Sequence, residues 1–223
     1  MTLRKRTQFK AIFISCILLV ASAFASASYA VDLFNDFPDS QGSLNLYVQA
    51  FNPVTLQFRN LERTGAFAFT TPGQASGRVA VTKSTDKLLF APIVGGVTYG
   101  TEHAVLTYEI NKTSLYNIVG TFKGSRSGCN AQAYIVYNYN TAVKPFDTTV
   151  NYNDSFSFDF AKVALNAGDH ISFIVDALDT HANDTIGLTG YINEAQLEAV
   201  PEPASIASLL MGLAGVLSIR RRK

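Results

Sequence analysis

The sequence contains no tryptophan, and its 223 residues include only two cysteines and two methionines. Cys16 lies in an apolar run near the N-terminus, so Cys129 is the one thiol that remains if that run is removed. A single thiol cannot form an internal disulfide, and we expect Cys129 to be a buried structural residue, with an intermolecular disulfide as the alternative. Charged residues are scarce at 16%, while 48% are hydrophobic, which excludes a disordered tail, a collagen-like chain and a multi-span membrane protein.

Motifs of dedicated enzymes and metal sites are also missing. The three histidines, His103, His170 and His181, do not have the spacing of a zinc site. No Gly-x-Ser-x-Gly, P-loop or dinucleotide fingerprint occurs in the sequence. We therefore expect no enzyme activity, although a hydrolase site assembled from residues far apart in sequence stays open as a lesser alternative.

The formal net charge of +1 conceals an uneven distribution. Four basic residues lie in the first ten positions, and the last four residues are basic. Residues 31–199 contain ten basic and sixteen acidic residues and so carry a net charge of −6. Because a negative domain repels phosphate backbones, this charge argues against a nucleic-acid partner.

The first 30 residues are predicted to be a secretory signal peptide. Their basic start is followed by an apolar run at 11–20 and then by small residues. Ser28-Tyr29-Ala30 and Ala25-Ser26-Ala27 both fit the small-x-small pattern that signal peptidase cleaves. We expect cleavage after Ala30, because the composition changes at Val31. The alternative is an uncleaved membrane anchor, which the short apolar run disfavours.

The C-terminal end consists of three parts. Pro201-Glu202-Pro203 precedes an apolar stretch at 204–219, and the chain closes with Arg220, Arg221, Arg222 and Lys223. The stretch has 16 residues. As a helix it would span roughly 24 Å, against about 30 Å for a hydrocarbon core, and the terminal cations can reach the headgroups. The basic cluster is expected to stay on the cytoplasmic side and to stop the segment in the membrane.

This order of motif, transmembrane helix and Arg-rich end resembles the PEP-CTERM sorting signal of Gram-negative bacteria. The resemblance implies that an exosortase, a membrane-embedded cysteine peptidase, recognises and cleaves the chain. It also implies transient attachment to the inner membrane and export to the outer surface or an exopolysaccharide matrix. Signal peptidase and exosortase would be processing enzymes of which this chain is the substrate. The alternative is an ordinary tail anchor.

Residues 31–199 are predicted to be one all-β domain, an antiparallel β-sandwich of two sheets with four or five strands each. Turn signals such as Gly95-Gly96 and Asn166-Ala167-Gly168 separate segments in which polar and apolar residues alternate. The clearest alternation is that of Phe156, Phe158 and Phe160 with polar neighbours. Between Tyr116 and Leu188 the order of these segments resembles the jelly-roll module of many PEP-CTERM proteins, which is similar to carbohydrate-binding modules. The missing tryptophan departs from that pattern.

Two groups of residues are candidates for binding. Tyr137 and Tyr139 would share one face of a regular strand and could stack against sugar rings, with core packing as the alternative. Asp176, Asp179 and Asp184 crowd one loop and could hold calcium, the one cofactor considered, with a solvated turn as the alternative.

Together these features predict an exported, non-enzymatic protein of the cell surface or extracellular matrix. A carbohydrate-binding module for an exopolysaccharide is the alternative, which would make a polysaccharide its partner. A hydrolase is the third and weakest hypothesis.

Overall fold

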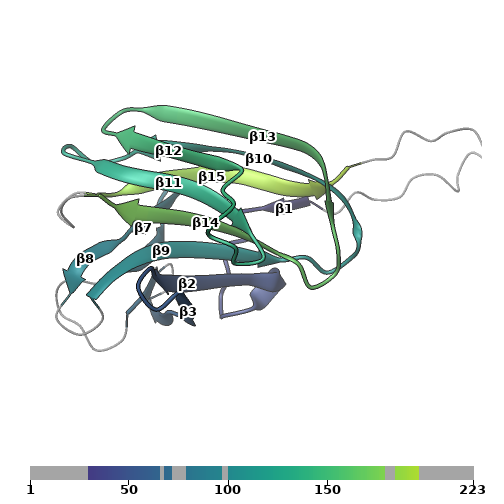
Figure 1. The fold of residues 1–223 in the computed structure, drawn as a ribbon, viewed down its shortest axis with the longest axis horizontal. Helices are drawn as coiled ribbons and strands as arrows, with labels where there is room; N and C mark the ends of the chain where they lie inside the picture. Colours follow the sequence, from purple (N-terminus) through teal and green to yellow (C-terminus); the bar gives the residue numbers. More distant parts are fainter. Residues whose placement is uncertain (1–29, 66–67, 72–78, 97–99, 179–183, 196–223) are drawn as a thin grey trace, which may run out of the picture.

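The described part of the chain consists of antiparallel strands, as its alternating segments predict. The computed structural model describes residues 30–65, 68–71, 79–96, 100–178 and 184–195. In these residues the strands form two sheets packed face to face, with one short 3-10 helix, η2 (Ser43–Asn45), and no α-helix (Figure 1). The predicted signal helix and C-terminal transmembrane helix lie outside the described residues.

Sheet A has eight strands in the order β13-β10-β15-β7-β6-β5-β4, with β1 beside β15. Its strands are β1 (Ala30–Asp32), β4 (Glu62–Gly65), β5 (Ala68–Thr70), β6 (Ala80–Lys83), β7 (Leu88–Ala91), β10 (Ser114–Gly124), β13 (Ser155–Leu165) and β15 (Ile186–Glu194). Sheet B has seven strands in the order β12-β11-β14-β9-β2-β3, with β8 beside β9. Its strands are β2 (Leu46–Asn52), β3 (Gln57–Asn60), β8 (Ile93–Gly96), β9 (Gly100–Glu109), β11 (Asn130–Tyr137), β12 (Phe146–Asn151) and β14 (His170–Ala177).

Eight of these strands have the order of a jelly roll. Sheet A contains β7-β15-β10-β13 and sheet B contains β9-β14-β11-β12, the double Greek-key arrangement. The predicted sandwich is therefore confirmed. Both sheets are larger than the expected four or five strands, because the chain before β7 adds β1 and β4–β6 to sheet A and β2 and β3 to sheet B, and β8 adds a further strand to sheet B.

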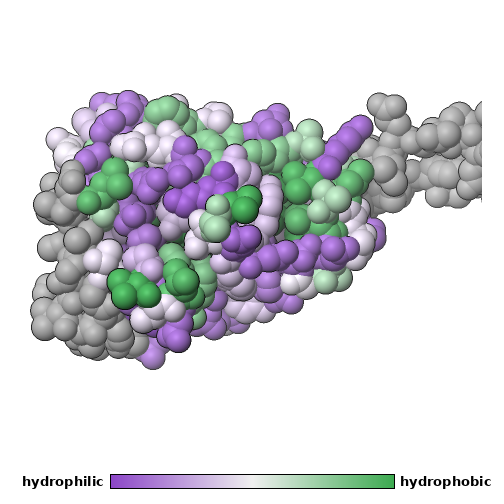
Figure 2. Space-filling view, viewed as in Figure 1, coloured by the Kyte–Doolittle hydropathy of each residue, from purple (hydrophilic) through white to green (hydrophobic). Residues whose placement is uncertain are grey.

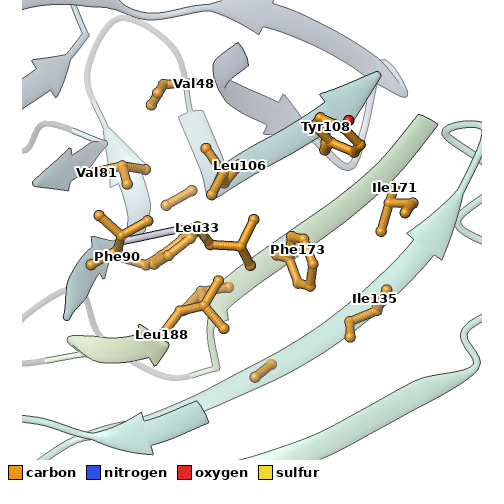
Figure 3. Packing of buried hydrophobic residues seen from close by; sticks show 14 of the residues in the cluster. Leu33, Val48, Val81, Phe90, Leu106, Tyr108, Ile135, Ile171, Phe173 and Leu188 are labelled. Atoms are coloured by element: carbon orange, nitrogen blue, oxygen red, sulfur yellow. The ribbon is translucent and has the colours of Figure 1, made fainter. Parts of the chain in front are cut away.

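The main hydrophobic core lies between the two sheets. Leu106 and Phe173 of sheet B and Phe90 and Leu188 of sheet A are all fully buried there (Figure 3). Phe158 of β13, at the centre of the predicted alternation, is 4% exposed. Burying such aromatic and branched side chains supplies most of the driving force for folding.

Glycines allow one close contact in sheet A. A Cβ on Gly120 of β10 would lie 2.5 Å from the Phe158 ring, and a Cβ on Gly190 of β15 would lie 2.4 Å from the Val119 carbonyl oxygen. The two glycines face each other in the β10–β15 pair. The missing side chain of Gly120 leaves space that the Phe158 ring occupies, and that of Gly190 lets the backbone of β10 lie close.

Of the predicted turns, Asn166-Ala167-Gly168 is confirmed. Gly168 has φ 88°, and the Asp169 amide donates to the Asn166 carbonyl at 3.0 Å. The turn expected at Gly95-Gly96 is wrong, because both glycines lie in β8.

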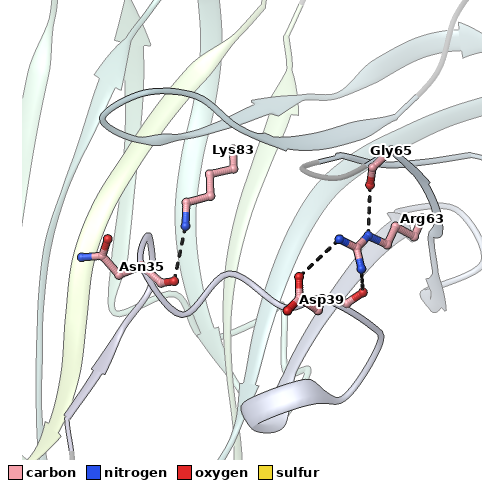
Figure 4. A network of polar contacts seen from close by, with 5 residues as sticks. All are labelled: Asn35, Asp39, Arg63, Gly65 and Lys83. Atoms are coloured by element: carbon pink, nitrogen blue, oxygen red, sulfur yellow. Dashed lines mark hydrogen bonds and ion pairs between the residues drawn. The ribbon is translucent and has the colours of Figure 1, made fainter.

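The segment between β1 and β2 is fastened to sheet A by polar contacts (Figure 4). The Arg63 guanidinium of β4 donates to the backbone and carboxylate oxygens of Asp39 and to the Gly65 carbonyl, and the Lys83 ammonium donates to the Asn35 carbonyl at 3.3 Å. β1 and β15 are antiparallel, with Ala30 opposite Asn193. The described chain therefore begins and ends at the same end of the sandwich (Figure 1).

Candidate functional site

The outer face of sheet B, the face turned away from sheet A, carries a second group of packed side chains. Along β2, β9, β11 and β14 the residues alternate between the main core and this face. Its apolar part is Phe51, Val105, Tyr134, Val136 and Ile174, with Phe58 packed against them, and we call this group the outer-face cluster. An outward-facing hydrophobic cluster is unusual for a face that simply meets water, so it is the first place to search for a site.

Aromatic rings form a continuous row across this face. Ring centroids lie 4.7 Å apart for His170 and Tyr139, 4.5 Å for Tyr139 and Phe58, and 4.5 Å for Phe58 and Phe51. The row continues from Phe51 to His103 at 5.4 Å. His170, Tyr139 and Phe58 are partly exposed, whereas Phe51 and His103 are buried. The accessible part of the row is thus its end near the loop that follows β11.

A polar row crosses the same strands. The Thr107 hydroxyl donates to the Gln49 side-chain oxygen at 2.8 Å and lies 2.9 Å from the Ser172 hydroxyl. The Gln49 amide donates to the Asn60 side-chain oxygen at 3.1 Å, and Asn60 is exposed at the edge strand β3. Amide and hydroxyl groups from four strands therefore form one connected row that reaches the surface at Asn60.

The third component is a buried chain of Tyr134, His103 and Asp176. The His103 ring lies with Nε2 3.0 Å from the Asp176 carboxylate and Nδ1 2.7 Å from the Tyr134 hydroxyl. A carboxylate only accepts, so Nε2 carries a hydrogen, and in the tautomer that has its one hydrogen there Nδ1 accepts from the tyrosine hydroxyl. Burial, followed by the charges of Asp176 and Asp147, raises the pKa of Tyr134 above its ordinary value of 10.0. The hydroxyl therefore keeps the proton that it donates.

The loop between β11 and β12 closes over Tyr134. The Lys144 ammonium lies 4.1 Å from the centre of the Tyr134 ring, a cation–π contact, and 3.3 Å from the Asp147 carboxylate. Asp147 also accepts from the Gln132 amide at 2.5 Å. Around the buried chain the surface thus presents one cation, two carboxylates and an amide.

The structure separates the two tyrosines that the alternation placed together. Tyr137, the last residue of β11, packs against the main core, whereas Tyr139 contacts Phe58 on the outer face. Asn138 and Tyr139 have φ of 52° and 58°, so the strand ends and the regular alternation stops. The expectation of a shared face is therefore wrong. Tyr134, which the alternation placed opposite to Tyr137, does lie on the outer face.

The predicted calcium residues do not meet in the part of the chain that is described. Asp176 binds His103, and the buried Asp184 accepts from the Asn130 amide at 3.0 Å. Asp179 lies outside the described residues. Within the described ranges no group of three or more His, Cys, Asp or Glu side chains is placed to hold a metal ion.

Cys129 is buried, as expected, with 4% of its surface exposed. Its thiol lies 3.6 Å from the Val150 carbonyl, and burial raises its pKa to about 11. A thiol with a raised pKa is a poor nucleophile, which agrees with a structural role.

The chain of Tyr134, His103 and Asp176 was missed in the sequence, because the three residues are 31 and more positions apart. A partial signal exists, since His103 alternates with core residues of β9.

The view in Figure 2 shows a mosaic of hydrophilic and separate hydrophobic areas over the described surface, so no broad apolar area marks a site on this side. Among the described residues no helix is long and apolar enough to cross a membrane.

Comparison with protein families gives one match, at the C-terminal end. Residues 199–223 match the PEP-CTERM protein-sorting motif. The resemblance of Pro201-Glu202-Pro203 and the segment that follows is confirmed. The motif implies an exported protein of the cell envelope or extracellular space that is processed by an exosortase.

Comparison with curated proteins gives no match. Similar solved structures include a module in complex with β-1,4-galactotriose, TmCBM61, with 6% identity, coverage of 77% of this chain and 90% of that chain, and a TM-score of 0.32. CBM51 from Clostridium perfringens, in complex with methyl-galactose, has 12% identity, coverage of 74% and 99%, and a TM-score of 0.38. A family 29 carbohydrate-binding module has 12% identity, coverage of 78% and 99%, and a TM-score of 0.38. With TM-scores under 0.5, no ligand or site of these proteins transfers to this chain.

Proposed function

We propose that this chain is the precursor of a non-enzymatic protein of the outer cell surface or extracellular matrix, released from its membrane segment by exosortase. The observation that carries the proposal is where the folded domain stops relative to the sorting motif. β15 ends at Glu194, and the Ala195 amide still donates to the Leu115 carbonyl at 2.7 Å, whereas the matched motif begins at 199.

Cleavage near Pro201-Glu202-Pro203 would therefore release a complete domain. β15 pairs with β10, β7 and β1 inside sheet A, so the last described strand is central rather than peripheral. None of the described strands would be lost with the removed segment, because all of them precede residue 195.

The N-terminal boundary is consistent with the same processing. Val31, the first residue after a cut behind Ala30, is 1% exposed and lies opposite Ile192. A cut behind Ala30 or Ala27 would leave Val31 in the core. The mature N-terminus and the sorting segment would then both leave from one end of the sandwich.

The test is mass spectrometry of the protein from its native host, for the wild type and for a chain that lacks residues 200–223. We expect the wild type to end near Pro201-Glu202-Pro203 and the truncated chain to bypass this processing. Substitution of Glu202→Ala with Pro201→Ala should also block cleavage, while Thr149→Ala, an exposed change on β12, serves as the matched control. A mature wild-type protein that still carries residues 204–223, or a truncated chain that is exported as well as the wild type, would refute the sorting role.

Polysaccharide binding through the outer face of sheet B is the second candidate function. Phe58, Tyr139 and His170 offer partly exposed rings, and Asn60 of β3, two residues after Phe58, offers an exposed amide. Asp176 and Lys144 add a carboxylate and an ammonium farther along the same face, around His103 and Tyr134. Sugars present apolar ring faces together with hydroxyls that both donate and accept, so aromatic rings flanked by amides and carboxylates match their chemistry. Tyr137, on the core side, would contribute only by supporting the strand.

Binding of the exported protein to the exopolysaccharide of its host tests this function. Phe58→Ala and Tyr139→Ala are expected to weaken retention, whereas Tyr152→Ala, at a tyrosine 48% exposed outside this face, is expected to leave it unchanged. Tyr137→Ala should lower the melting temperature, because this side chain packs against the main core, and should weaken retention less than the two outer-face variants do. Retention that is unaffected by both outer-face variants would reject this face as the site.

The absence of catalysis is part of the proposal and rests on how His103 is used. Both ring nitrogens are occupied, one by a buried tyrosine and one by Asp176. A general base needs a free nitrogen within reach of a substrate proton. Hydrolysis of host polysaccharide by the purified protein, lost in His103→Gln, would overturn this conclusion.

A further inference from the structure

The outer edge of β13 is the longest unpaired strand edge in the described part of the chain. β13 closes one end of sheet A, and it pairs with β10 on one side only. It has 11 residues, whereas the other three sheet-end strands, β4, β12 and β3, have four, six and four. An unpaired edge presents a row of backbone donors and acceptors that can pair with another chain.

One part of this edge is blunted and the other is not. The register with β10 shifts between Tyr116 and Ile118, and Lys162, opposite this shift, has φ 57°. A bulge with a lysine is a common device against edge pairing. It leaves Ser155–Ala161 as a straight segment of alternating Ser, Phe and Asp with one charge.

The straight segment is complementary to itself. When two copies extend one sheet by antiparallel pairing, each residue lies opposite a residue whose side chain points to the same face. The two-fold axis between the copies must therefore pass beside a residue and not between two residues. An axis beside Phe158, the midpoint, sets Ser157 opposite Asp159 and Phe156 opposite Phe160. The serine hydroxyl can then donate to the carboxylate, and two aromatic pairs form. An axis beside Asp159 would instead bring two carboxylates together.

The exposure of these side chains fits such a contact. Ser155, Ser157 and Asp159 are exposed, and Phe156 is 36% exposed although its neighbours Phe158 and Phe122 are buried. The charged residues that flank the straight segment, Asp154 and Lys162, have opposite signs. No like charges face each other in this register.

We infer that β13 is a self-association edge, through which a second copy of this chain extends sheet A by antiparallel pairing around Phe158. The contact is isologous, because the same segment serves in both copies, and it closes after two copies. It lies in sheet A and leaves the outer face of sheet B open. A dimer would therefore present two outer faces of sheet B at once.

Sedimentation equilibrium of the exported protein over a range of concentrations tests the inference. Ser157→Lys sets a cation opposite each Asp159 and is expected to tighten dimerisation, whereas Ser157→Asp sets carboxylates against each other and weakens it. With two symmetric pairs in the dimer, each change should shift the dissociation constant roughly 2- to 30-fold. Thr149→Lys and Thr149→Asp, at an exposed position of β12, are the matched controls and should have no effect.

A covalent readout checks the register independently. The double variant Ser157→Cys with Asp159→Cys is expected to give an oxidised dimer on a non-reducing gel, which Asp159→Cys alone should not give. Circular dichroism confirms that these exposed substitutions keep the fold. A protein that stays monomeric at its highest soluble concentration, or Lys and Asp variants that shift dimerisation in the same direction, would overturn the inference.

Discussion

Replacing Tyr134 by phenylalanine probes the buried chain of the outer face with the smallest possible change. The substitution removes one hydroxyl and keeps the ring, whose face contacts Lys144 at 4.1 Å. Tyr134 is 3% exposed and His103 is 6% exposed, so water cannot easily replace the hydroxyl that lies 2.7 Å from Nδ1.

The expected cost follows from the group that is left behind. The lost hydrogen bond leaves the ring nitrogen of His103 buried without a donor, and an unsatisfied buried polar group costs about 1–3 kcal/mol. For a domain of this size, 1 kcal/mol lowers the melting temperature by roughly 2–4 °C. Tyr134→Phe should therefore melt about 2–12 °C below the wild type. Tyr152→Phe, at a tyrosine that is 48% exposed, should melt with the wild type.

Thermal and urea unfolding, followed by circular dichroism, measure this loss. A double-mutant cycle with His103→Leu separates the unsatisfied nitrogen from other effects, because removing both partners should cost less than the sum of the single losses. A Tyr134→Phe protein within about 0.5 kcal/mol of the wild type would refute the reasoning, since it would mean that the nitrogen finds another donor or that the site opens to water.

Three further predictions concern charges. Glu102 is 2% exposed and binds the Arg59 guanidinium through both oxygens, so Arg59→Ala should cost about 3–5 kcal/mol by removing the cation that this buried carboxylate binds, as measured by urea unfolding. A loss below about 1 kcal/mol would show that the Glu102 carboxylate reaches water instead. The raised pKa of Tyr134 means that the unfolded chain releases this proton first as the pH rises. The stability that this hydroxyl contributes is thus fully present below pH about 10 and is lost above it, by up to about 1.4 kcal/mol per pH unit. The free energy of unfolding, measured against pH, should therefore decline less steeply for Tyr134→Phe than for the wild type. Calcium bound at Asp176, Asp179 and Asp184 would raise the melting temperature when calcium is added in excess over chelator. A melting temperature that calcium leaves unchanged, or raises equally in the wild type and in Asp184→Asn, would remove that hypothesis.

Local patterns in the sequence predicted the fold class because they report on local requirements. Alternation at Phe156, Phe158 and Phe160 follows from the two-residue repeat of a strand, and Phe158 is buried as this repeat requires. The turn at Gly168 was found because its φ of 88° favours glycine. Gly95-Gly96 looked the same in sequence, yet both residues lie in β8, since glycine can also occupy extended backbone.

The candidate site was only half predicted. Tyr139 was selected for an exposed face, but its partner Tyr137 faces the core, because two residues with positive φ end the alternation. Asn138 is a residue type that often adopts positive φ, whereas the positive φ of Tyr139 has no such signal. Asp176 was selected for calcium and instead pairs with His103, which lies 73 positions earlier in the chain.

The sequence by itself determined the features that depend on chemistry along the chain: the sorting motif, the acidic charge of the domain and the alternation of its strands. It also predicts the signal segment that ends at Ala30. Sorting signals are recognised as linear segments, so their order and composition are sufficient. Only the tertiary structure decided which strands are neighbours, which face carries Tyr134 and His103 beside Asp176, and that β13 is left as an edge. These features depend on pairing between residues that are distant in sequence, and a local pattern of polar and apolar residues fits many such pairings equally well.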